Sequence, residues 1–565
     1  MQTQRSLLPL LPALTLLALL GPVFGGLYGT LLPAFGHLPA AGQVGPSLDP
    51  FRDLLTWPGF LPSVRLSMMT GIGAAFLSLS GVALILAGWS GTRAFRWVER
   101  MLSPLLSVPH AAAAFGLAFL IAPSGWLLRL ISPWLTGWER PPDVLILQDP
   151  LGLSLIAGLV MKEIPFLLLM SIAAMGQVGG AKQLAVAQSL GYGRIAGWLA
   201  VVFPAIYMRI RLPVLVVLAW SMSVVDVAVI LGPSTPSTLS VQIVRWMSDP
   251  DLTLRLQAAA AALIQLGLVI VAQLVWYVAE WSLVQLSKRY FHMGRRHARD
   301  RLLRGVGIGF AGVVSLTLIL GLLGLALWSF AGFWSFPDLL PHQFTLRSWQ
   351  RHGAGSLEAL TETALIAGCV VTLGVVLTLG CLEAEERHNL RLTSKGMWLL
   401  YLPLLVPQTA FIPGLQTLLL NFGLETGRGA VILAHLVFVL PYLRLSLQDP
   451  WTQWDRRQAV SSAALGASPR RIFWRVRLPM LLAPILTAIA VGVAVSVGQY
   501  LPTLLIGGGR VETLTTEAVA LASGGDRRAI GVFGLLQTAA ALLPFAIALL
   551  VPALVWRKRK GLRHG

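Results

Sequence analysis

Five polar side chains lie inside apolar stretches that are long enough to cross a membrane, and they are the residues best placed to act on a solute. They are Lys162, Glu163, Asp226, Gln499 and Tyr500. An ionisable group at membrane depth is costly to bury and is therefore a functional candidate. Two interpretations stay open: these side chains contact a solute or gate its path, or they form a buried polar lock between helices.

Two polar loops of the same form are the second set of candidates. They contain residues 182–191 and 457–466, and in each loop a proline, Pro204 or Pro479, follows the final glycine thirteen residues later. Each sequence predicts a short Ala-rich helix that ends at a glycine able to adopt φ > 0. A basic amphipathic segment then leads to the proline, where the chain returns to the membrane. We therefore expect each loop to form a small, rigid knob rather than only a solvated connection.

The two loops belong to an internal duplication with a shift of 275 residues. Residues 182–251 align with residues 457–526 without a gap, and several Gly, Pro, Ser and Gln positions coincide. A repeat of this kind predicts two halves of similar structure. The copies differ at Asp226, which is matched by Leu501, so the chemistry of the polar groups is not two-fold symmetric.

The composition defines the class of protein. Of 565 residues, 56% are hydrophobic and 12% are charged, and the mean hydropathy is +0.74. Soluble globular proteins are about 45–50% apolar and about 25% charged, and disordered chains are poorer still in apolar residues. The sequence is therefore that of a polytopic membrane protein. Its two cysteines, Cys369 and Cys381, share one apolar stretch and offer neither a disulfide framework nor zinc-ligand spacing.

The elements that must position these residues are membrane-spanning helices. A hydrocarbon core of about 30 Å needs about 20 mostly apolar residues per helix. Twelve stretches meet this length, at residues 7–27, 64–89, 102–122, 151–176, 205–232, 258–286, 305–330, 357–382, 398–420, 430–448, 480–506 and 530–555. The predicted fold class is an all-α polytopic integral membrane protein with two parallel six-helix repeats, related by an axis along the membrane normal. The predicted domains are a first repeat at 1–286, a basic cytoplasmic linker at 287–304 and a second repeat at 305–565.

The basic residues predict the orientation. The segments on one side of the twelve spans hold 27 of the 43 Lys and Arg residues, and the opposite segments hold 11. Because Lys and Arg accumulate in cytoplasmic loops, the first side is expected to be cytoplasmic, with both termini on it. Residues 1–28 also fit a signal peptide. However, the second half has an equivalent stretch at 305–330 that cannot be cleaved, which favours a retained first helix.

The second loop resembles the signature loop of binding-protein-dependent ABC importer permeases (MetI-like superfamily), which reads E-A-A-x-x-x-G with a later hydrophobic residue and proline. The resemblance covers essentially the whole chain, as two permease units fused in tandem, similar to the ferric-iron and thiamine permeases. Both copies depart from the motif at the leading acid, where Ala185 and Val460 replace glutamate and remove one expected polar contact to the ATPase. The resemblance assigns coupling to Ala187, Leu190, Gly191, Pro204, Ala463, Ala464, Leu465, Gly466, Ala467, Ser468 and Pro479.

The resemblance implies the transmembrane permease subunit of an ATP-binding-cassette importer in the bacterial inner membrane. Each loop, at about 177–204 and 451–479, would form a coupling helix that docks on one of two copies of a separate ATPase subunit. A periplasmic or extracellular substrate-binding protein would deliver ferric iron, thiamine or another small solute. ATP and Mg²⁺ would bind to the ATPase, and no cofactor or metal to this chain. Residues 179–183 lack the spacing and the Ser or Thr of a phosphate-binding loop, so hydrolysis would occur on the partner.

Other classes of function are weighed against the importer. An ion-coupled secondary transporter also uses two six-helix halves, but it needs neither an ATPase nor two knobs at matching positions. An intramembrane enzyme would need a convergent catalytic set, and the spans contain no paired His/Glu metal spacing and no nucleophile motif. Nucleic-acid binding is disfavoured, because cytoplasmic loops explain the excess of basic residues and the net charge of +19.

Overall fold

The computed structural model of the chain describes residues 8–293, 300–388, 394–424 and 426–556. Within these ranges, ten helices are long and apolar enough to cross a membrane, and two further helix pairs, each bent at a short break, bring the number of spans to as many as twelve. The predicted all-α polytopic fold class is thereby confirmed. Part of the predicted linker, residues 294–299, lies outside the described residues, as do residues 1–7 and 557–565 at the two termini.

The helices follow one another in a similar order in the two halves. The first half contains α1 (Leu11–Ala34), α2 (Asp49–Thr56), α3 (Phe60–Trp89), α4 (Arg93–Leu105), α5 (His110–Ile121), α6 (Trp126–Ile131), α7 (Leu153–Gly176), α8 (Gly180–Ser189), α9 (Arg194–Gly197), α10 (Phe203–Ser223), α11 (Asp226–Leu231), α12 (Leu239–Met247) and α13 (Leu254–His292). The second half contains α14 (Arg301–Phe330), α15 (Arg347–Arg387), α16 (Ser394–Leu405), α17 (Gln408–Asn421), α18 (Arg428–Gln453), α19 (Arg457–Ala464), α20 (Pro469–Ile472), α21 (Leu478–Met480), α22 (Leu482–Val497), α23 (Leu501–Gly507), α24 (Leu514–Gly524) and α25 (Arg527–Val555). In both halves a π-helical turn precedes the fifth span, at Trp198–Val202 and Phe473–Arg477.

Four of the predicted spans are interrupted, which corrects the expectation of continuous helices at 102–122, 205–232, 398–420 and 480–506. The breaks occur at matching places in the two halves: between α4 and α5, between α16 and α17, between α10 and α11, and between α22 and α23. Pro109 and Pro407 stand directly before α5 and α17. A proline has no N–H to donate and disfavours helical backbone in the residue before it, so it explains the first pair of breaks.

The duplication is visible element by element. The start residues of α9 and α20, of α11 and α23, and of α12 and α24 are each 275 positions apart. One hydrogen bond also recurs: the amide of Leu239 donates to Ser67 Oγ at 2.9 Å, and the amide of Leu514 donates to Thr363 Oγ1 at 3.0 Å. Hydroxyl groups on α3 and α15 therefore hold equivalent helix starts, and the structure supports two repeats in the predicted register.

The first helix of each half packs against the other half. In α1, Gly26 lies so close to α17 that a Cβ atom there would be 2.2 Å from the carbonyl oxygen of Phe411, and Thr30 Oγ1 donates to Ala410 O at 2.8 Å. In the same way, Gly116 of α5 meets Gly321 of α14, with a Cβ on Gly116 2.9 Å from the backbone of that glycine. Small residues allow such close approach of membrane helices. Gly26 and Thr30 therefore hold α1 against the second half of the protein.

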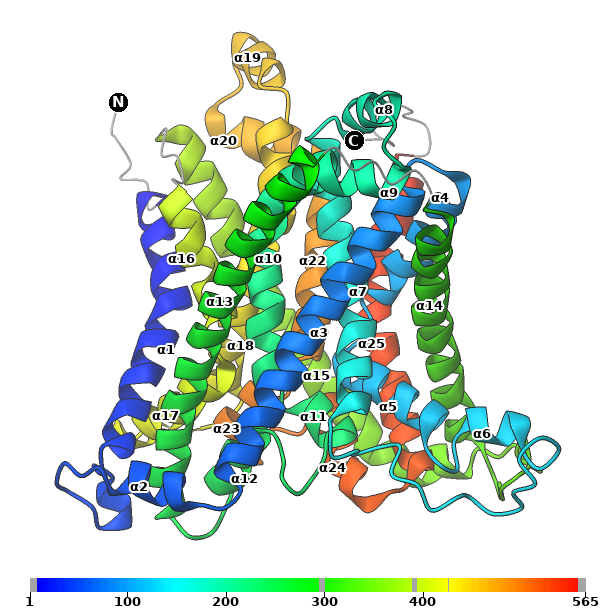
Figure 1. The fold of residues 1–565 in the computed structure, drawn as a ribbon. Helices are drawn as coiled ribbons and strands as arrows, with labels where there is room; N and C mark the ends of the chain where they lie inside the picture. Colours follow the sequence, from blue (N-terminus) through cyan, green and yellow to red (C-terminus); the bar gives the residue numbers. More distant parts are fainter. Residues whose placement is uncertain (1–7, 294–299, 389–393, 425, 557–565) are drawn as a thin grey trace.

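The short helices between spans gather at two opposite ends of the molecule (Figure 1). The helices α8, α9, α19 and α20 lie at one end, which we call the loop end, together with the first turn of α1 and the last turn of α25. The helices α2, α6, α12 and α24 lie at the opposite end. The two predicted knobs therefore project from the same end of the protein.

Candidate coupling helices and membrane path

Both predicted knobs are helices that end in the same glycine cap. Gly191 after α8 has φ +89° and Gly466 after α19 has φ +83°, which confirms the predicted left-handed glycines. After α19, the amide of Ala467 donates to Ser462 O at 3.0 Å and that of Gly466 to Ala463 O at 2.9 Å. The same two bonds occur after α8, so each helix ends in a Schellman motif.

The helix α8 lies against its own half of the protein. Its residues Leu184 and Ala187 are buried, and a Cβ atom on Gly197 of α9 would lie 3.0 Å from that of Ala187. The structure therefore places Ala187 against α9, away from the outward surface on which a partner would dock. Leu190, by contrast, is 53% exposed, and Pro204, the second residue of α10, is also exposed.

The helix α19 stands away from the rest of the protein (Figure 1). None of its residues is buried, and Leu465 at its tip is 89% exposed. Ala463, Ala464 and Gly466 are also exposed, whereas Ala467 and Pro479 are half-buried. Ser468 Oγ accepts the amide of Arg471 and so caps α20. The loop also exposes arginine side chains at positions 456, 457, 470, 471 and 475, which gives this knob a basic rim.

The first loop is tied to the end of α3 and to the start of α14. Arg194 Nε donates to Ala87 O at 3.2 Å, and the same guanidinium also donates to Ser90 O. The amide of Ile195 donates to Asp300 Oδ2 at 2.8 Å. The indole of Trp198 is buried behind these contacts. Backbone carbonyls and apolar packing therefore hold the base of α8.

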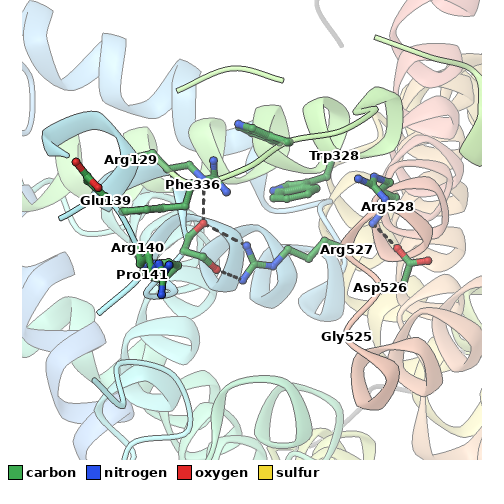
Figure 2. A pocket seen from close by; sticks show the side chains of 12 residues that line it. Arg129, Glu139, Arg140, Pro141, Trp328, Phe336, Gly525, Asp526, Arg527 and Arg528 are labelled. Atoms are coloured by element: carbon green, nitrogen blue, oxygen red, sulfur yellow. Dashed lines mark hydrogen bonds between the residues drawn. The ribbon is translucent and has the colours of Figure 1, made fainter. Parts of the chain in front are cut away.

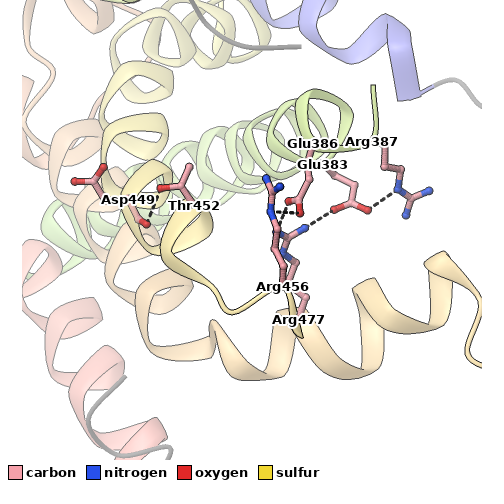
Figure 3. A network of polar contacts seen from close by, with 7 residues as sticks. All are labelled: Glu383, Glu386, Arg387, Asp449, Thr452, Arg456 and Arg477. Carbon is pink, nitrogen blue, oxygen red and sulfur yellow. Dashed lines mark hydrogen bonds and ion pairs between the residues drawn. The ribbon is translucent and has the colours of Figure 1, made fainter. Parts of the chain in front are cut away.

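The second loop is held by a buried arginine that the sequence analysis missed. Arg477 is 6% exposed, with its guanidinium 4.1 Å from the ring centre of Trp451 and 4.6 Å from that of Trp454. It pairs with Glu383 at 3.1 Å and also with Glu386, both at the end of α15 (Figure 3). The equivalent position in the first repeat is Val202, a buried apolar residue. The two knobs are therefore anchored by different chemistry.

The five polar residues of the predicted path fall into two groups, and Lys162 lies by itself at a break between two helices. Its Nζ is within 3.3 Å, 3.1 Å and 2.5 Å of the carbonyl oxygens of Leu105, Leu106 and Val108, at the break between α4 and α5. Carbonyl groups at the end of a helix lack partners within that helix and attract a cation. Lys162 is 3% exposed, and its ammonium group supplies these carbonyls with a hydrogen-bond donor.

The carboxylates of the first half lie near tyrosines of the second half. Glu163 is buried near Tyr442 of α18. Asp226, the first residue of α11, is buried near Tyr500, which lies at the break between α22 and α23. Gln499 is half-buried beside this tyrosine. These four predicted residues therefore lie where the halves meet or where spans are broken.

Comparison with known proteins shows the family. A family model described as "Binding-protein-dependent transport system inner membrane component" matches residues 374–555, which include α19 and its glycine cap. The inner membrane ABC transporter permease protein YnjC of Escherichia coli is 33% identical over 559 residues, covering 97% of this chain and 98% of that protein. The chain belongs to this permease family. The predicted family and the predicted ABC importer permease function are both confirmed.

Shorter relatives match a part of the permease. The molybdenum transport system permease protein ModB of Mycobacterium bovis is 28% identical over 36% of this chain and 85% of its own length. The spermidine/putrescine transport system permease protein PotC homolog of Mycoplasma pneumoniae is 30% identical over 26% of this chain and 50% of its own length. A relative that aligns over most of its own length covers only about a third of this chain, which fits two fused permease units.

The family assigns the permease to transport in the inner membrane. The chain is a transport permease, which is consistent with a subunit that is not itself an enzyme. The ion-coupled secondary transporter is excluded, because the relatives are permeases of ABC transport systems.

Proposed function

We propose that α8 and α19 are the two coupling helices of an importer, and that each docks on one copy of a separate ATPase subunit. The observation that carries this proposal is their shared geometry: two glycine-capped helices project from the same end of the molecule, each with an exposed leucine directly before its glycine. On α8 the docking surface includes Leu190 and Gly191. On α19 it consists of residues 463–468. Ala187, Pro204 and Pro479 support these surfaces from behind.

The basic rim of α19 favours an acidic groove on the partner. The exposed arginines surround an apolar tip, and complementary charges steer such surfaces together. These arginines also offer polar contacts on a helix that has Val460 where the family motif has glutamate. ATP and Mg²⁺ would bind only to the ATPase, and ATP binding would draw the two knobs together and rock the halves between inward- and outward-facing states.

We place the solute path where the halves meet, with Glu163, Asp226, Gln499 and Tyr500 as the residues that contact solute or gate its passage. The loop end would face the cytoplasm, with both termini on that side. A substrate-binding protein would deliver a small polar solute to the opposite end. The two permease units would be residues 1–286 and 305–565, joined by the linker at 287–304.

The proposal is tested by removing each apolar tip in turn. Leu190→Asp and Leu465→Asp, each in the full chain, should reduce recovery of the ATPase with the affinity-tagged permease from mild detergent by about tenfold or more, since a buried leucine contributes about 1.5–3 kcal/mol. Leu48→Asp is the matched control, because Leu48 is 56% exposed directly before α2 at the opposite end. Undiminished recovery in both tip variants would contradict the proposal.

The orientation is tested separately by labelling. In a permease that lacks Cys369 and Cys381, Ser468→Cys should react with a membrane-impermeant maleimide only when the cytoplasmic face is accessible. Leu48→Cys should show the reverse pattern. Labelling of Ser468→Cys from outside intact cells would overturn the assigned orientation.

A further inference from the structure

A cavity of about 450 Å³ opens at the opposite end of the molecule, between the two halves (Figure 2). The first half contributes Ser124, Arg129 and residues 139–141, which include Arg140. The second half contributes Trp328, Trp334, Phe336 and residues 525–528. Four arginines and two carboxylates line this cavity, a net charge of +2. Its lining is therefore basic and aromatic, unlike that of the solute path.

Contacts between the two halves hold Arg129 of this cavity in place. Arg129 is 4% exposed, and its Nη1 donates to Ser335 O at 2.5 Å and Asp338 O at 2.8 Å, while Nε donates to Ser124 O at 3.0 Å. Its guanidinium also lies 4.8 Å from the ring centre of Trp334. This arginine joins the two halves and gives the cavity a rigid positive wall.

The other arginines keep donors free for a ligand. Arg527 Nη2 donates to Ser124 Oγ at 2.7 Å, and its guanidinium lies over Trp328 at 5.3 Å. Arg528 Nη2 donates to Gly332 O at 2.6 Å, whereas its buried Nε has no partner among the described residues. In the same described part of the chain, Arg140 makes no hydrogen bond or ion pair, although its side chain lines the cavity.

The two carboxylates of the lining do not neutralise its four arginines. Asp526 Oδ1 accepts the amides of Arg528 and Ala529 at 3.0 Å and 3.3 Å and so caps α25. Glu139, the other carboxylate of the lining, makes no hydrogen bond or ion pair among the described residues. Guanidinium groups bind phosphate oxygens with strong, often bidentate hydrogen bonds. A ligand with a phosphate group therefore matches the donors that the cavity presents.

The position of the cavity indicates where this phosphate comes from. Arg129, Arg527 and Arg528 lie at the ends of the spans His110–Ile131 and Arg527–Val555, at the level where a helix leaves the hydrocarbon core, and Arg140 lies in the loop that follows the first of these spans. Trp134 and Leu135, between Arg129 and Glu139, are 73% and 65% exposed. Exposed aromatic and leucine side chains at span ends are typical of the membrane–water interface. We propose that the cavity binds the phosphate of an anionic phospholipid from the adjacent leaflet and thereby links the two halves.

Native mass spectrometry of the full-length permease, released from nanodiscs with equal fractions of phosphatidylglycerol and phosphatidylcholine, tests this site. Wild-type protein should retain phosphatidylglycerol in preference. Arg140→Gln and Arg528→Gln should each reduce its retention about tenfold, since a charged hydrogen bond contributes about 1.5–3 kcal/mol. Arg140 makes no contact that the fold needs, so Arg140→Gln separates lipid binding from folding. Arg52→Gln is the matched control, because Arg52 is exposed on α2 at the same end and should leave retention unchanged.

Three outcomes would overturn the proposal. The first is equal retention of the two lipids, or retention that neither Arg140→Gln nor Arg528→Gln reduces. The second is displacement of the bound lipid by millimolar inorganic phosphate, which would identify a site for a soluble anion. The third is loss of substrate-binding-protein capture in both variants with lipid retention unchanged, which would identify the cavity as a docking point for acidic side chains of that protein.

Discussion

Replacing Arg477 with methionine tests how the second coupling helix is anchored. Methionine keeps much of the side-chain volume but leaves Glu383 and Glu386 without the buried guanidinium that pairs with both. Removing one member of a buried ion pair costs about 3–5 kcal/mol. We expect the lower end of this range, because Arg387 and Arg456 still reach the two carboxylates. The loop around α19 should therefore open locally far more often than in the wild type.

Hydrogen–deuterium exchange of the full-length permease in nanodiscs measures this opening. A loss of about 3 kcal/mol corresponds to exchange that is on the order of 100-fold faster, in the amides of residues 466–477. The amides of residues 180–191 should not change, since the first loop is held by other contacts. Arg456→Met is the matched control: the Arg456 side chain is 77% exposed and its ion pair with Glu386 is 3.6 Å long, and pairs of an exposed arginine contribute little. Unchanged exchange in Arg477→Met, or an equal effect in Arg456→Met, would refute the reasoning.

Four further substitutions probe other parts of the account. Lys162→Met should lower the melting temperature by several degrees, because each buried carbonyl left without a donor costs about 1–3 kcal/mol. An unchanged melting temperature together with lost uptake would mean that Lys162 contacts solute instead. Gly466→Val should reduce uptake per ATP hydrolysed without loss of membrane insertion, since a left-handed conformation costs an ordinary residue about 1–2 kcal/mol, whereas Gly466→Asn should be tolerated. Uptake equal to that of the wild type in the valine variant would mean that the loop only connects two spans. Gly26→Leu should destabilise the contact of α1 with α17, whereas Gly21→Leu, which meets only Leu17, should melt like the wild type; equal melting of both variants would contradict this packing. Burial acts to raise the pKa of Asp149, but hydrogen bonds from the amides of Leu153 and Ser154 and from the Ser154 hydroxyl hold this pKa below its ordinary value. Asp149→Ala should therefore lower the melting temperature at pH 7, and the difference from the wild type should vanish as the pH falls through the lowered pKa. A difference in melting temperature that does not depend on pH would contradict this prediction.

Local features of the two loops could be predicted from the sequence because glycine and proline constrain the backbone by themselves. The positions of Gly191 and Gly466 fixed the helix ends, and the shift of 275 residues fixed which elements correspond. Pro109 and Pro407 also carried a signal for the breaks after α4 and α16, but a hydropathy window of about 20 residues averages over such breaks. The spans were therefore predicted in number and not in continuity.

Contacts between distant segments could not be predicted in this way. Arg477 looks like one of several arginines in a basic loop, and only folding brings it between two tryptophans and the acidic end of α15. The sequence marked Lys162 as a candidate for solute contact but gave no sign of its partners at the α4 break. His435, which is buried in α18, hydrogen-bonds through Nδ1 with Ser496 Oγ at 3.0 Å and through Nε2 with Thr503 Oγ1 at 2.8 Å. The role of each of these buried polar residues depends on partners that are distant in the sequence, so the sequence around the residue does not reveal it.

The docking of both coupling helices on an ATPase is tested most directly by site-specific photo-crosslinking in intact membranes. A photoreactive amino acid at position 190 or 465 should give an adduct with the ATPase subunit, and the same amino acid at position 48 should not. We expect both adducts to form, because both leucine tips are exposed at the same end of the permease. Adducts from only one of the two positions, or ATPase adducts from position 48, would contradict the account.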